Sequence, residues 1–362
     1  MNNLEKARKE IGEIDKNIAI LFERRMQEAK RVALYKKEHG LPVVDSAREE
    51  SLIERNSTLI TDENLRGYYV DFLKETMNLS KKYQHRILDG MRVAFSGVKG
   101  AFAEITAKKV FPDAITVPYD SFSAAYKAVE EGECDCAFLP IENSFEGDVA
   151  RVLDLAFFGS LYINGVYESQ IIQNLLCKKD VHFSEIKTVI SHPQALGQCR
   201  DFISKHGLAK IECVNTAVAA KTVFESDDRT LAAIASEEAA ALYNLKVVKS
   251  HINESSLNTT RFAVFSKNYK QPNSDDNRFI MLFTVKNQAG SLGNAITVIG
   301  EHGFNLRALK SRPTKELVWD YYFYVEGEGN INSESGKKML AELKKCCDNL
   351  RVAASFEKEV KV

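Results

Sequence analysis

The chain has 362 residues, more than one hydrophobic core usually spans, so we expect two or three domains. Hydrophobic residues make up 44% of it, and a formal net charge of -1 gives no overall field that attracts nucleic acid or an anionic membrane. No apolar run reaches the roughly 20 residues of a membrane span, and residues 1–15 are charged and hold no signal-peptide core. We therefore expect a globular, cytoplasmic protein without nucleic-acid or membrane partners.

The cysteines argue against both a disulfide framework and a metal site. There are seven, an odd number that favours reduced thiols. Cys134 and Cys136 alternate within an apolar run, and Cys346 and Cys347 are adjacent. Neither pair has a second pair or a histidine at the spacing of a zinc site. The sequence therefore predicts no metal.

Three regions of the chain differ in their hydrophobic periodicity. Residues 1 to about 87 repeat with a helical period, and residues 91 to about 268 alternate short apolar runs with helical stretches, as α/β folds do. The segment Asn268–Asn277 is polar and rich in helix breakers, so it is predicted to be a linker. The predicted domains are 1–90, 91–268 and 278–356.

The first predicted helix carries cations on its apolar side. Its stripe consists of Leu4, Ile11, Ile14, Ile18 and Leu21, and the same spacing continues through Ala29 and Val32. Arg8, Arg25 and Lys36 fall on this stripe. Cations on a buried face are costly unless an anion meets them, although long side chains can also snorkel from the edge of a stripe.

Two more helices are expected to follow the break at Gly40 and Pro42. The second is predicted to begin near Asp45, with Ser46 and Glu49 spaced as a capping box and Arg48 in its first turn. Glu49 is therefore either a cap partner or a site residue. The third is predicted over residues 62–87 and places Ser80 and Gln84 on one face, where they form either a surface pair or part of a site.

Three helices with a cationic interior resemble the all-helical chorismate mutases. The resemblance implies that two carboxylates of chorismate meet arginine forks, that Lys36 and Gln84 donate to the ether oxygen, and that Glu49 accepts from the hydroxyl. It also implies that the first helix is shared across a dimer, so that Arg8 serves the neighbouring subunit. The residues that match the family's site are Arg8, Arg25, Lys36, Asp45, Arg48, Glu49, Ser80 and Gln84.

The central region ends several apolar strands in polar residues. A strand over 91–96 is followed by a glycine turn, Gly97–Gly100, that is neither a Walker A loop nor a GxGxxG fingerprint. Other predicted strands end at Pro140–Ser144 and Ser191–Gln194, and Asn258–Phe262 precedes a strand over 262–266. Each segment alone can be a turn or a cap, but the carboxyl ends of strands in α/β sheets are where ligands bind.

Together these segments resemble prephenate dehydratase. The resemblance implies two α/β lobes around a cleft, like type II periplasmic binding proteins, over about 91–168 with 250–268 and over about 169–249. It implies that Thr260 donates to the departing hydroxide and that Arg261 binds a substrate carboxylate. His192 is expected to be structural because it precedes Pro193 at a strand end. The other residues expected to line the cleft are Asn143, Ser144, Ser191, Gln194 and Thr216.

Two positions depart from the dehydratase pattern. Ala103 stands where the family usually has Ser or Thr, which removes a hydroxyl from the mouth of the cleft. Asn244 stands where the family usually has Gly, a mild change because Asn tolerates the left-handed conformation.

The last region is predicted to run strand, helix, two strands, helix, strand. The strands are expected at 279–285, 305–311, 319–325 and 351–356, and the helices at 289–302 and 334–346. This order resembles an ACT domain, a module that pairs across a dimer and binds amino acids, here L-phenylalanine. The residues matching its ligand motifs are Gly290, Ser291, Leu292, Ser311, Arg312 and Pro313.

Lys310 stands where the ACT motif of the dehydratases has Glu, which reverses a charge next to the expected ligand. The module is therefore either a weakened phenylalanine sensor or a dimerisation element only. The resemblances together imply chorismate and prephenate as substrates, a homodimer or homotetramer, and no cofactor.

Two rival functions remain at this point. A chorismate mutase fused to prephenate dehydrogenase needs a strand followed by GxGxxG, which the sequence lacks. An amino-acid-binding regulator without catalysis needs neither cations on an apolar stripe nor Thr260 beside Arg261. Turnover of chorismate and prephenate separates the second rival from a bifunctional enzyme.

Overall fold

The computed structural model describes residues 2–255, 257–271, 273–314 and 320–362. The chain divides into two compact units, Met1–Met91 and Arg92–Val362. Among the described residues, no helix has both the length and the apolarity needed to cross a membrane.

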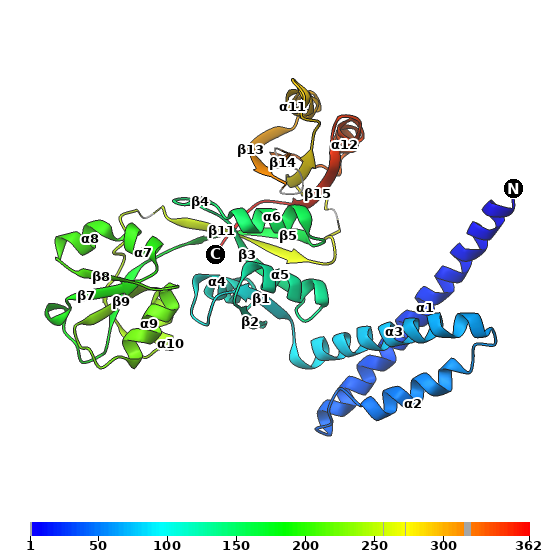
Figure 1. The fold of residues 1–362 in the computed structure, drawn as a ribbon, viewed down its shortest axis with the longest axis horizontal. Helices are drawn as coiled ribbons and strands as arrows, with labels where there is room; N and C mark the ends of the chain where they lie inside the picture. Colours follow the sequence, from blue (N-terminus) through cyan, green and yellow to red (C-terminus); the bar gives the residue numbers. More distant parts are fainter. Residues whose placement is uncertain (1, 256, 272, 315–319) are drawn as a thin grey trace. The chain divides into compact units, whose positions relative to one another are not determined.

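The first unit is all helical (Figure 1), as predicted. Its helices are α1 (Asn3–Glu38), α2 (Ser46–Ser57) and α3 (Glu63–Asp89). The predicted capping box of Ser46 and Glu49 is wrong. Asp45 caps α2, with its side chain accepting from the backbone N–H of Arg48 at 3.1 Å. Glu49 instead forms an ion pair with Lys81, in which Glu49 Oε2 lies 2.9 Å from Lys81 Nζ.

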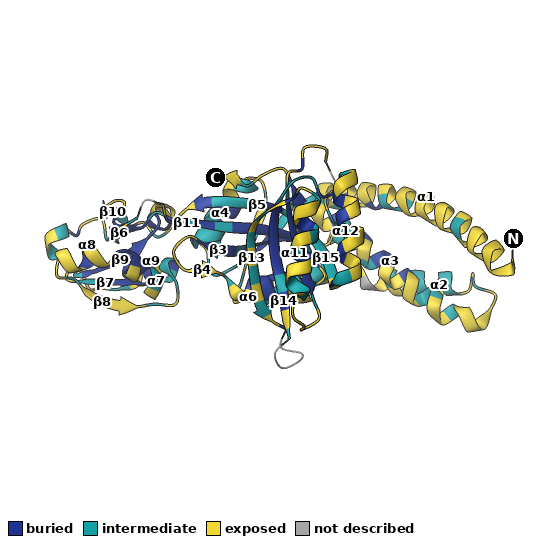
Figure 2. Cartoon of the chain, turned by 90° about the horizontal axis from the view of Figure 1, so that it is seen from above, coloured by how far each residue is buried: buried dark blue, intermediate teal, exposed yellow. Residues whose placement is uncertain are grey.

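The apolar stripe of α1 is buried only near its C-terminal end. Ala29 and Ala33 are buried, whereas Leu4, Ile11 and Ile18 keep 57%, 56% and 46% of their surface exposed. Figure 2 shows this helix exposed along most of its length. The expectation that the whole stripe is buried is therefore wrong for the single chain, because α1 is 36 residues long and α3 only 27.

The second unit begins with a mixed sheet in the order β2-β1-β3-β11-β5. β1 is parallel to β2 and β3, while β11 is antiparallel to both β3 and β5. The strands are β1 (Arg92–Ser96), β2 (Ile115–Tyr119), β3 (Cys136–Asn143), β5 (Tyr162–Gln170) and β11 (Thr259–Ser266), with the short β4 (Gly147–Asp148) beside β3. The helices of this lobe are α4 (Phe102–Val110), α5 (Phe122–Glu131) and α6 (Ala150–Phe158).

A second lobe is inserted between β5 and β11, so the chain crosses between the lobes twice. Its sheet has the order β10-β6-β9-β7-β8, and β7 lies where the sequence predicts a strand. The strands are β6 (Asn174–Cys177), β7 (Thr188–Ser191), β8 (Ala209–Glu212), β9 (Leu231–Ala235) and β10 (Lys246–Lys249). The helices are η1 (Phe183–Glu185), α7 (Pro193–Gln198), α8 (Arg200–Lys205), α9 (Thr216–Glu225) and α10 (Glu237–Leu242). Asn244 adopts a φ of 54°, the left-handed conformation expected for it.

The C-terminal module follows the predicted order of elements. It consists of β12 (Arg278–Thr284), α11 (Ser291–Glu301), β13 (Asn305–Pro313), β14 (Tyr321–Glu328), α12 (Glu334–Cys346) and β15 (Asp348–Phe356). Its antiparallel sheet, in the order β13-β14-β12-β15, continues into the first lobe, where β15 and β16 (Val360–Lys361) both pair with β5. Residue 319, the predicted start of the third strand, lies outside the described residues.

Candidate active sites

A pocket of about 360 Å³ opens inside the helical unit. Its walls come from α1, α2 and α3, and it gathers seven of the eight residues that the sequence indicates for this unit. These are Arg25, Lys36, Asp45, Arg48, Glu49, Ser80 and Gln84. Arg8, the eighth, is exposed and does not line the pocket.

The polar groups of this pocket hold one another in place. Arg25 donates to Ser80 Oγ and, at 3.2 Å, to the carbonyl oxygen of Thr76, and burial lowers the pKa of its guanidinium. Lys36 Nζ donates to the carbonyl oxygen of Val43 at 2.7 Å. Gln84 Oε1 is buried and has no hydrogen-bond partner among the described residues. This oxygen is available to accept a hydrogen bond from a ligand, since an unpaired buried polar atom is costly.

Sequence analysis missed Lys81, which lines the pocket and forms an ion pair with Glu49. Both side chains are 28% exposed. Its position in the sequence could have indicated this, because Lys81 follows Ser80 and lies three residues before Gln84, close to the same face of the helix. Four cations therefore face a single cavity: Arg25 and Lys36 from α1, Arg48 from α2 and Lys81 from α3.

A second cavity of about 410 Å³ lies between the two lobes of the second unit. Of the residues predicted to line it, Asn143, Gln194, Thr216 and Thr260 do so. His192 also lines it, and its Nδ1 caps α7 by accepting from the N–H of Gln194 at 3.3 Å.

The pairing of Asn143 with Thr260 makes the threonine hydroxyl a donor to the cleft. Asn143 Oδ1 accepts from the N–H groups of Phe145 and Glu146 at 2.9 and 3.1 Å, so its Nδ2 faces the other way. That Nδ2 donates to Thr260 Oγ1 at 2.9 Å. Because the oxygen already accepts this bond, the hydroxyl proton of Thr260 is available for a ligand.

The same network continues into residues that the sequence analysis did not single out. Asn143 Nδ2 also donates to Asn258 Oδ1 at 3.0 Å, and Asn258 Nδ2 donates to Gln198 Oε1 at 2.9 Å. Gln198 and Gln173 both line the cleft, and Gln173 Oε1 is buried without a partner among the described residues. Gln198 could have been found, because it follows Gln194 by one helical turn.

Ser144 and Ser191 do not line the cleft, contrary to the prediction. Ser191 is fully buried, and its hydroxyl donates to the carbonyl oxygen of Ile234 at 2.6 Å, which joins β7 to β9. Ser144 donates to the carbonyl oxygen of Leu257 and accepts from the N–H of Thr259, both at 3.0 Å. Both hydroxyls are used to hold the chain segments that surround the cleft.

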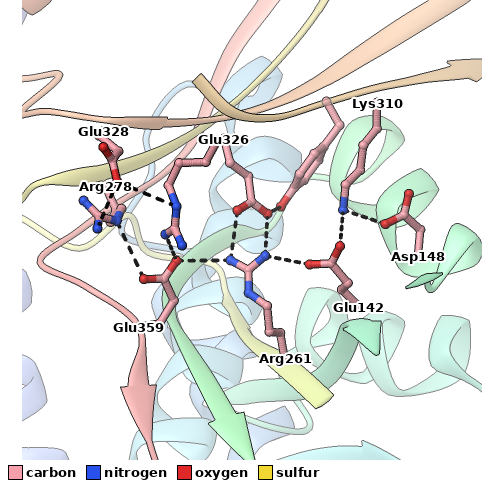
Figure 3. A network of polar contacts seen from close by, with 10 residues as sticks. Glu142, Asp148, Arg261, Arg278, Lys310, Glu326, Glu328 and Glu359 are labelled. Atoms are coloured by element: carbon pink, nitrogen blue, oxygen red, sulfur yellow. Dashed lines mark hydrogen bonds and ion pairs between the residues drawn. The ribbon is translucent and has the colours of Figure 1, made fainter. Parts of the chain in front are cut away.

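Arg261 does not face the cleft either, and its predicted role as a carboxylate ligand is wrong for this chain. β11 begins at Thr259, so neighbouring side chains alternate and Arg261 points away from Thr260. Figure 3 shows its guanidinium among carboxylates. Its partners are Glu142 at 2.8 Å, Glu326 at 2.9 Å and Glu359 at 3.3 Å. Burial opposes its charge, but Glu326 and Glu142 together outweigh that effect and raise the pKa of Arg261.

Two residues of the expected phenylalanine motif also face the first lobe. Lys310 Nζ lies 3.0 Å from Glu142 and 2.5 Å from Asp148, and Arg312 Nε lies 2.8 Å from Asp154. Alternation along β13 leaves Ser311 and Pro313 exposed on the other side. The charge of Lys310 therefore faces the first lobe, on the opposite side of β13 from Ser311.

We expect Arg261→Met to lower the free energy of unfolding by about 3–5 kcal/mol at pH 7, because it leaves buried carboxylates short of a cation. Burial raises the pKa of Glu142, but Arg261 and Lys310 outweigh it and lower the pKa below its ordinary value. A carboxyl group whose pKa is lower in the folded than in the unfolded protein stabilises the fold at pH values above its unfolded pKa. This stabilisation is lost as the pH falls through the folded pKa. The deficit should therefore shrink towards pH 4 in denaturant unfolding, and a deficit that grows on acidification contradicts the account.

Charge in the cleft is sparse and negative. Among its described lining residues there is no Lys or Arg, whereas Glu146 and Asp148 contribute carboxylates. The N-terminal ends of α4 and α9 open onto the cleft at Phe102 and Thr216, one from each lobe. Free backbone N–H groups and the helix dipole at such ends favour anions.

Comparison with known proteins agrees with this division into two sites. The family model for chorismate mutase type II matches residues 7–85, and that for prephenate dehydratase matches residues 93–270. The chain is 33% identical to a bifunctional chorismate mutase/prephenate dehydratase of Aquifex aeolicus (strain VF5), and the alignment covers 99% of each chain.

Solved structures resemble the second unit. A prephenate dehydratase from Arthrobacter aurescens in complex with L-Phe is 27% identical with a TM-score of 0.69, covering 74% of this chain and 90% of that one. GqqA, described as a novel type of quorum quenching acylase, is 26% identical with a TM-score of 0.69, covering 75% of this chain and 98% of that one.

Proposed function

The chain belongs to the family of bifunctional chorismate mutase/prephenate dehydratases, and from this membership we propose that each cavity carries one reaction. The protein converts chorismate to prephenate and prephenate to phenylpyruvate in phenylalanine biosynthesis. The pocket of the helical unit is assigned to the first step and the interlobe cleft to the second.

The mutase reaction needs positioning and electrostatics rather than proton transfer. As chorismate rearranges, its ether carbon–oxygen bond breaks while a carbon–carbon bond forms. Arg25 and Arg48 are placed to bind the two carboxylates and hold a compact conformer, since planar guanidinium forks match carboxylates. Lys36 and the side-chain NH2 group of Gln84 then donate to the ether oxygen as negative charge develops there, and Glu49 accepts from the ring hydroxyl. Arg8 is assigned to the site of a neighbouring subunit.

The dehydratase reaction is assigned to Asn143 and Thr260. The bond between the ring and its carboxylate breaks, carbon dioxide leaves, and the released electron pair aromatises the ring as hydroxide departs. Thr260 donates its hydrogen bond to that departing oxygen, and Asn143 orients the hydroxyl from behind at 2.9 Å. This pairing is the observation that carries the assignment, and Thr260→Ala tests it.

Substrate carboxylates in the cleft are assigned to backbone groups. Because Arg261 faces away from the cleft, the positive groups at the cleft are the N-terminal ends of α4 and α9. The hydroxyl of Thr216 and the side-chain amide of Gln194 are further hydrogen-bond donors there. Binding from both lobes at once draws them together over the substrate, as expected of type II periplasmic-binding-protein-like lobes joined by two crossings. The domain limits 1–90, 91–268 and 278–356 fit this assignment.

The C-terminal module is assigned as an ACT domain that binds L-phenylalanine between two partner copies and reduces dehydratase activity. Its βαββαβ order supports this assignment, as does the exposure of Ser311 and Pro313 on one side of β13. Gly290, with a φ of 84°, begins α11 next to Ser291 and Leu292. Assembly into a homodimer or homotetramer follows from a ligand site of this kind, and the exposed stripe of α1 supports the same conclusion.

We expect Gly290→Val to weaken phenylalanine binding at least about tenfold in calorimetry, since a β-branched residue is strained at positive φ. Gly293→Ala is the matched control. Gly293 lies inside α11 with nothing within 4 Å of an added Cβ, so phenylalanine should bind this variant as it binds the wild type. Absence of binding to the wild type would leave the module as a dimerisation element only.

A further inference from the structure

The lip of the dehydratase cleft carries a carboxylate beside the catalytic strand pair. β4 pairs with the end of β3, so that Gly147 lies opposite Asn143 and Asp148 lies opposite Glu142. Gly147 and Asp148 both line the cleft. Because Thr260 lines the same cleft, a substrate with two carboxylates that binds there lies near the charge of Asp148, and like charges repel.

A lysine from the C-terminal module compensates this carboxylate. Lys310 Nζ lies 2.5 Å from Asp148 Oδ1 and 3.0 Å from Glu142 Oε1, with only 15% of its side chain exposed. Figure 3 shows Lys310 reaching from its strand to both acidic side chains. Burial opposes its charge, but the hydrogen bonds to Asp148 and Glu142 outweigh that effect and raise the pKa of Lys310.

Glu142 does not depend on Lys310 alone, because Arg261 binds its other carboxylate oxygen at 2.8 Å. For Asp148, Lys310 is the cation that the structure places within ion-pair distance among the described residues. Loss of the lysine therefore exposes the charge of Asp148 at the cleft and leaves Glu142 paired.

We propose that Lys310 is a positioning residue of the dehydratase site, supplied by the C-terminal module, that neutralises Asp148 so that the cleft accepts a dicarboxylate substrate. The inference rests on the assignment of the cleft to prephenate. It gives the C-terminal module a part in substrate binding that is independent of any regulatory ligand. Because Lys310 touches the lip and not Thr260, its effect falls on KM rather than on kcat.

The test measures prephenate dehydration by full-length variants at low ionic strength. Lys310→Met should raise KM for prephenate about tenfold and leave kcat within about twofold, since a rim charge acts on encounter and binding. Lys310→Arg should retain a KM near that of the wild type. Added salt should reduce the defect of Lys310→Met, because it screens the exposed carboxylate. Asp148→Asn introduced into Lys310→Met should return KM to within about twofold of wild type, because the uncompensated charge is then absent.

The control is Lys337→Met, which removes a lysine of the same module whose side chain is 65% exposed and pairs with Glu334. It should leave both constants unchanged. An unchanged KM in Lys310→Met overturns the proposal. A raised KM that does not fall when Asp148→Asn is added also overturns it, since the ion pair of Lys310 with Asp148 is then only structural. Thr260→Ala is assayed alongside. If that variant dehydrates prephenate normally, the assignment of the cleft fails whatever Lys310 does.

Discussion

Thr260→Ala is expected to slow the conversion of prephenate to phenylpyruvate about 10²–10³-fold, the usual effect of removing one positioned donor. Thr260 is 9% exposed and lines the cleft, and its Oγ1 accepts from Asn143 Nδ2 at 2.9 Å. Its proton is therefore available to a ligand. Stopped assays of phenylpyruvate formation give kcat, and KM should change much less than kcat because the bond strengthens as hydroxide departs.

Three variants separate the hydroxyl from the shape of the side chain. Thr260→Ser keeps a donor and should retain part of the activity, whereas Thr260→Val keeps the branched shape and should be as slow as alanine. Thr259→Ala changes the preceding residue, whose side chain alternates to the other face of β11, and should be nearly normal. Chorismate mutase activity, measured on the same samples, should be unaffected in all of them. Equal rates for alanine and wild type would exclude Thr260 as the donor.

Arg25→Ala is expected to reduce chorismate mutase activity by roughly 10³-fold or more, because it removes both a carboxylate ligand and a fixed charge from the pocket. Dehydration of added prephenate should remain close to wild type. The fold should survive, since Ser80, which loses its bond from Arg25, still donates to the carbonyl oxygen of Thr76 at 2.9 Å. Thermal unfolding of the variant checks this point.

Arg25→Lys keeps the charge and loses the planar fork, so we expect it to recover only a small part of the mutase rate. Arg24→Ala, at the exposed preceding position of α1, is the matched control and should behave like wild type. Simultaneous loss of both activities in Arg25→Ala would indicate misfolding, and full mutase activity would refute the assignment of the pocket.

Local patterns of the sequence predicted the elements, and the resemblance to the chorismate mutases indicated most of the helical pocket. Helical periodicity placed Arg25 and Lys36 on one stripe of the first helix and Ser80 and Gln84 on one face of the third, because the position of a residue on a helix depends only on its spacing. The partners could not be predicted in this way. The ion pair of Glu49 with Lys81 joins two different helices, α2 and α3. The exposure of the apolar stripe of α1 depends on the lengths of the helices that pack against it.

The error over Arg261 has one physical cause, which is the position at which β11 begins. A strand predicted from residue 262 leaves Thr260 and Arg261 in a loop, where both can face one ligand. In the structure β11 begins at Thr259, and the two side chains point to opposite faces. The ion pairs of Arg261 with Glu326 and of Lys310 with Asp148 join residues 65 and 162 positions apart. No local pattern in the sequence indicates such partners.

The central claim is that one chain carries both reactions in separate sites, and incubation of the purified protein with chorismate tests it most directly. Wild type should form phenylpyruvate, Thr260→Ala should accumulate prephenate, and Arg25→Ala should leave chorismate unchanged yet still convert added prephenate. A mixture of the two variants should restore phenylpyruvate formation, because prephenate made by one is consumed by the other. Chorismate that stays unchanged with the wild type, or prephenate that accumulates without phenylpyruvate, would contradict the account.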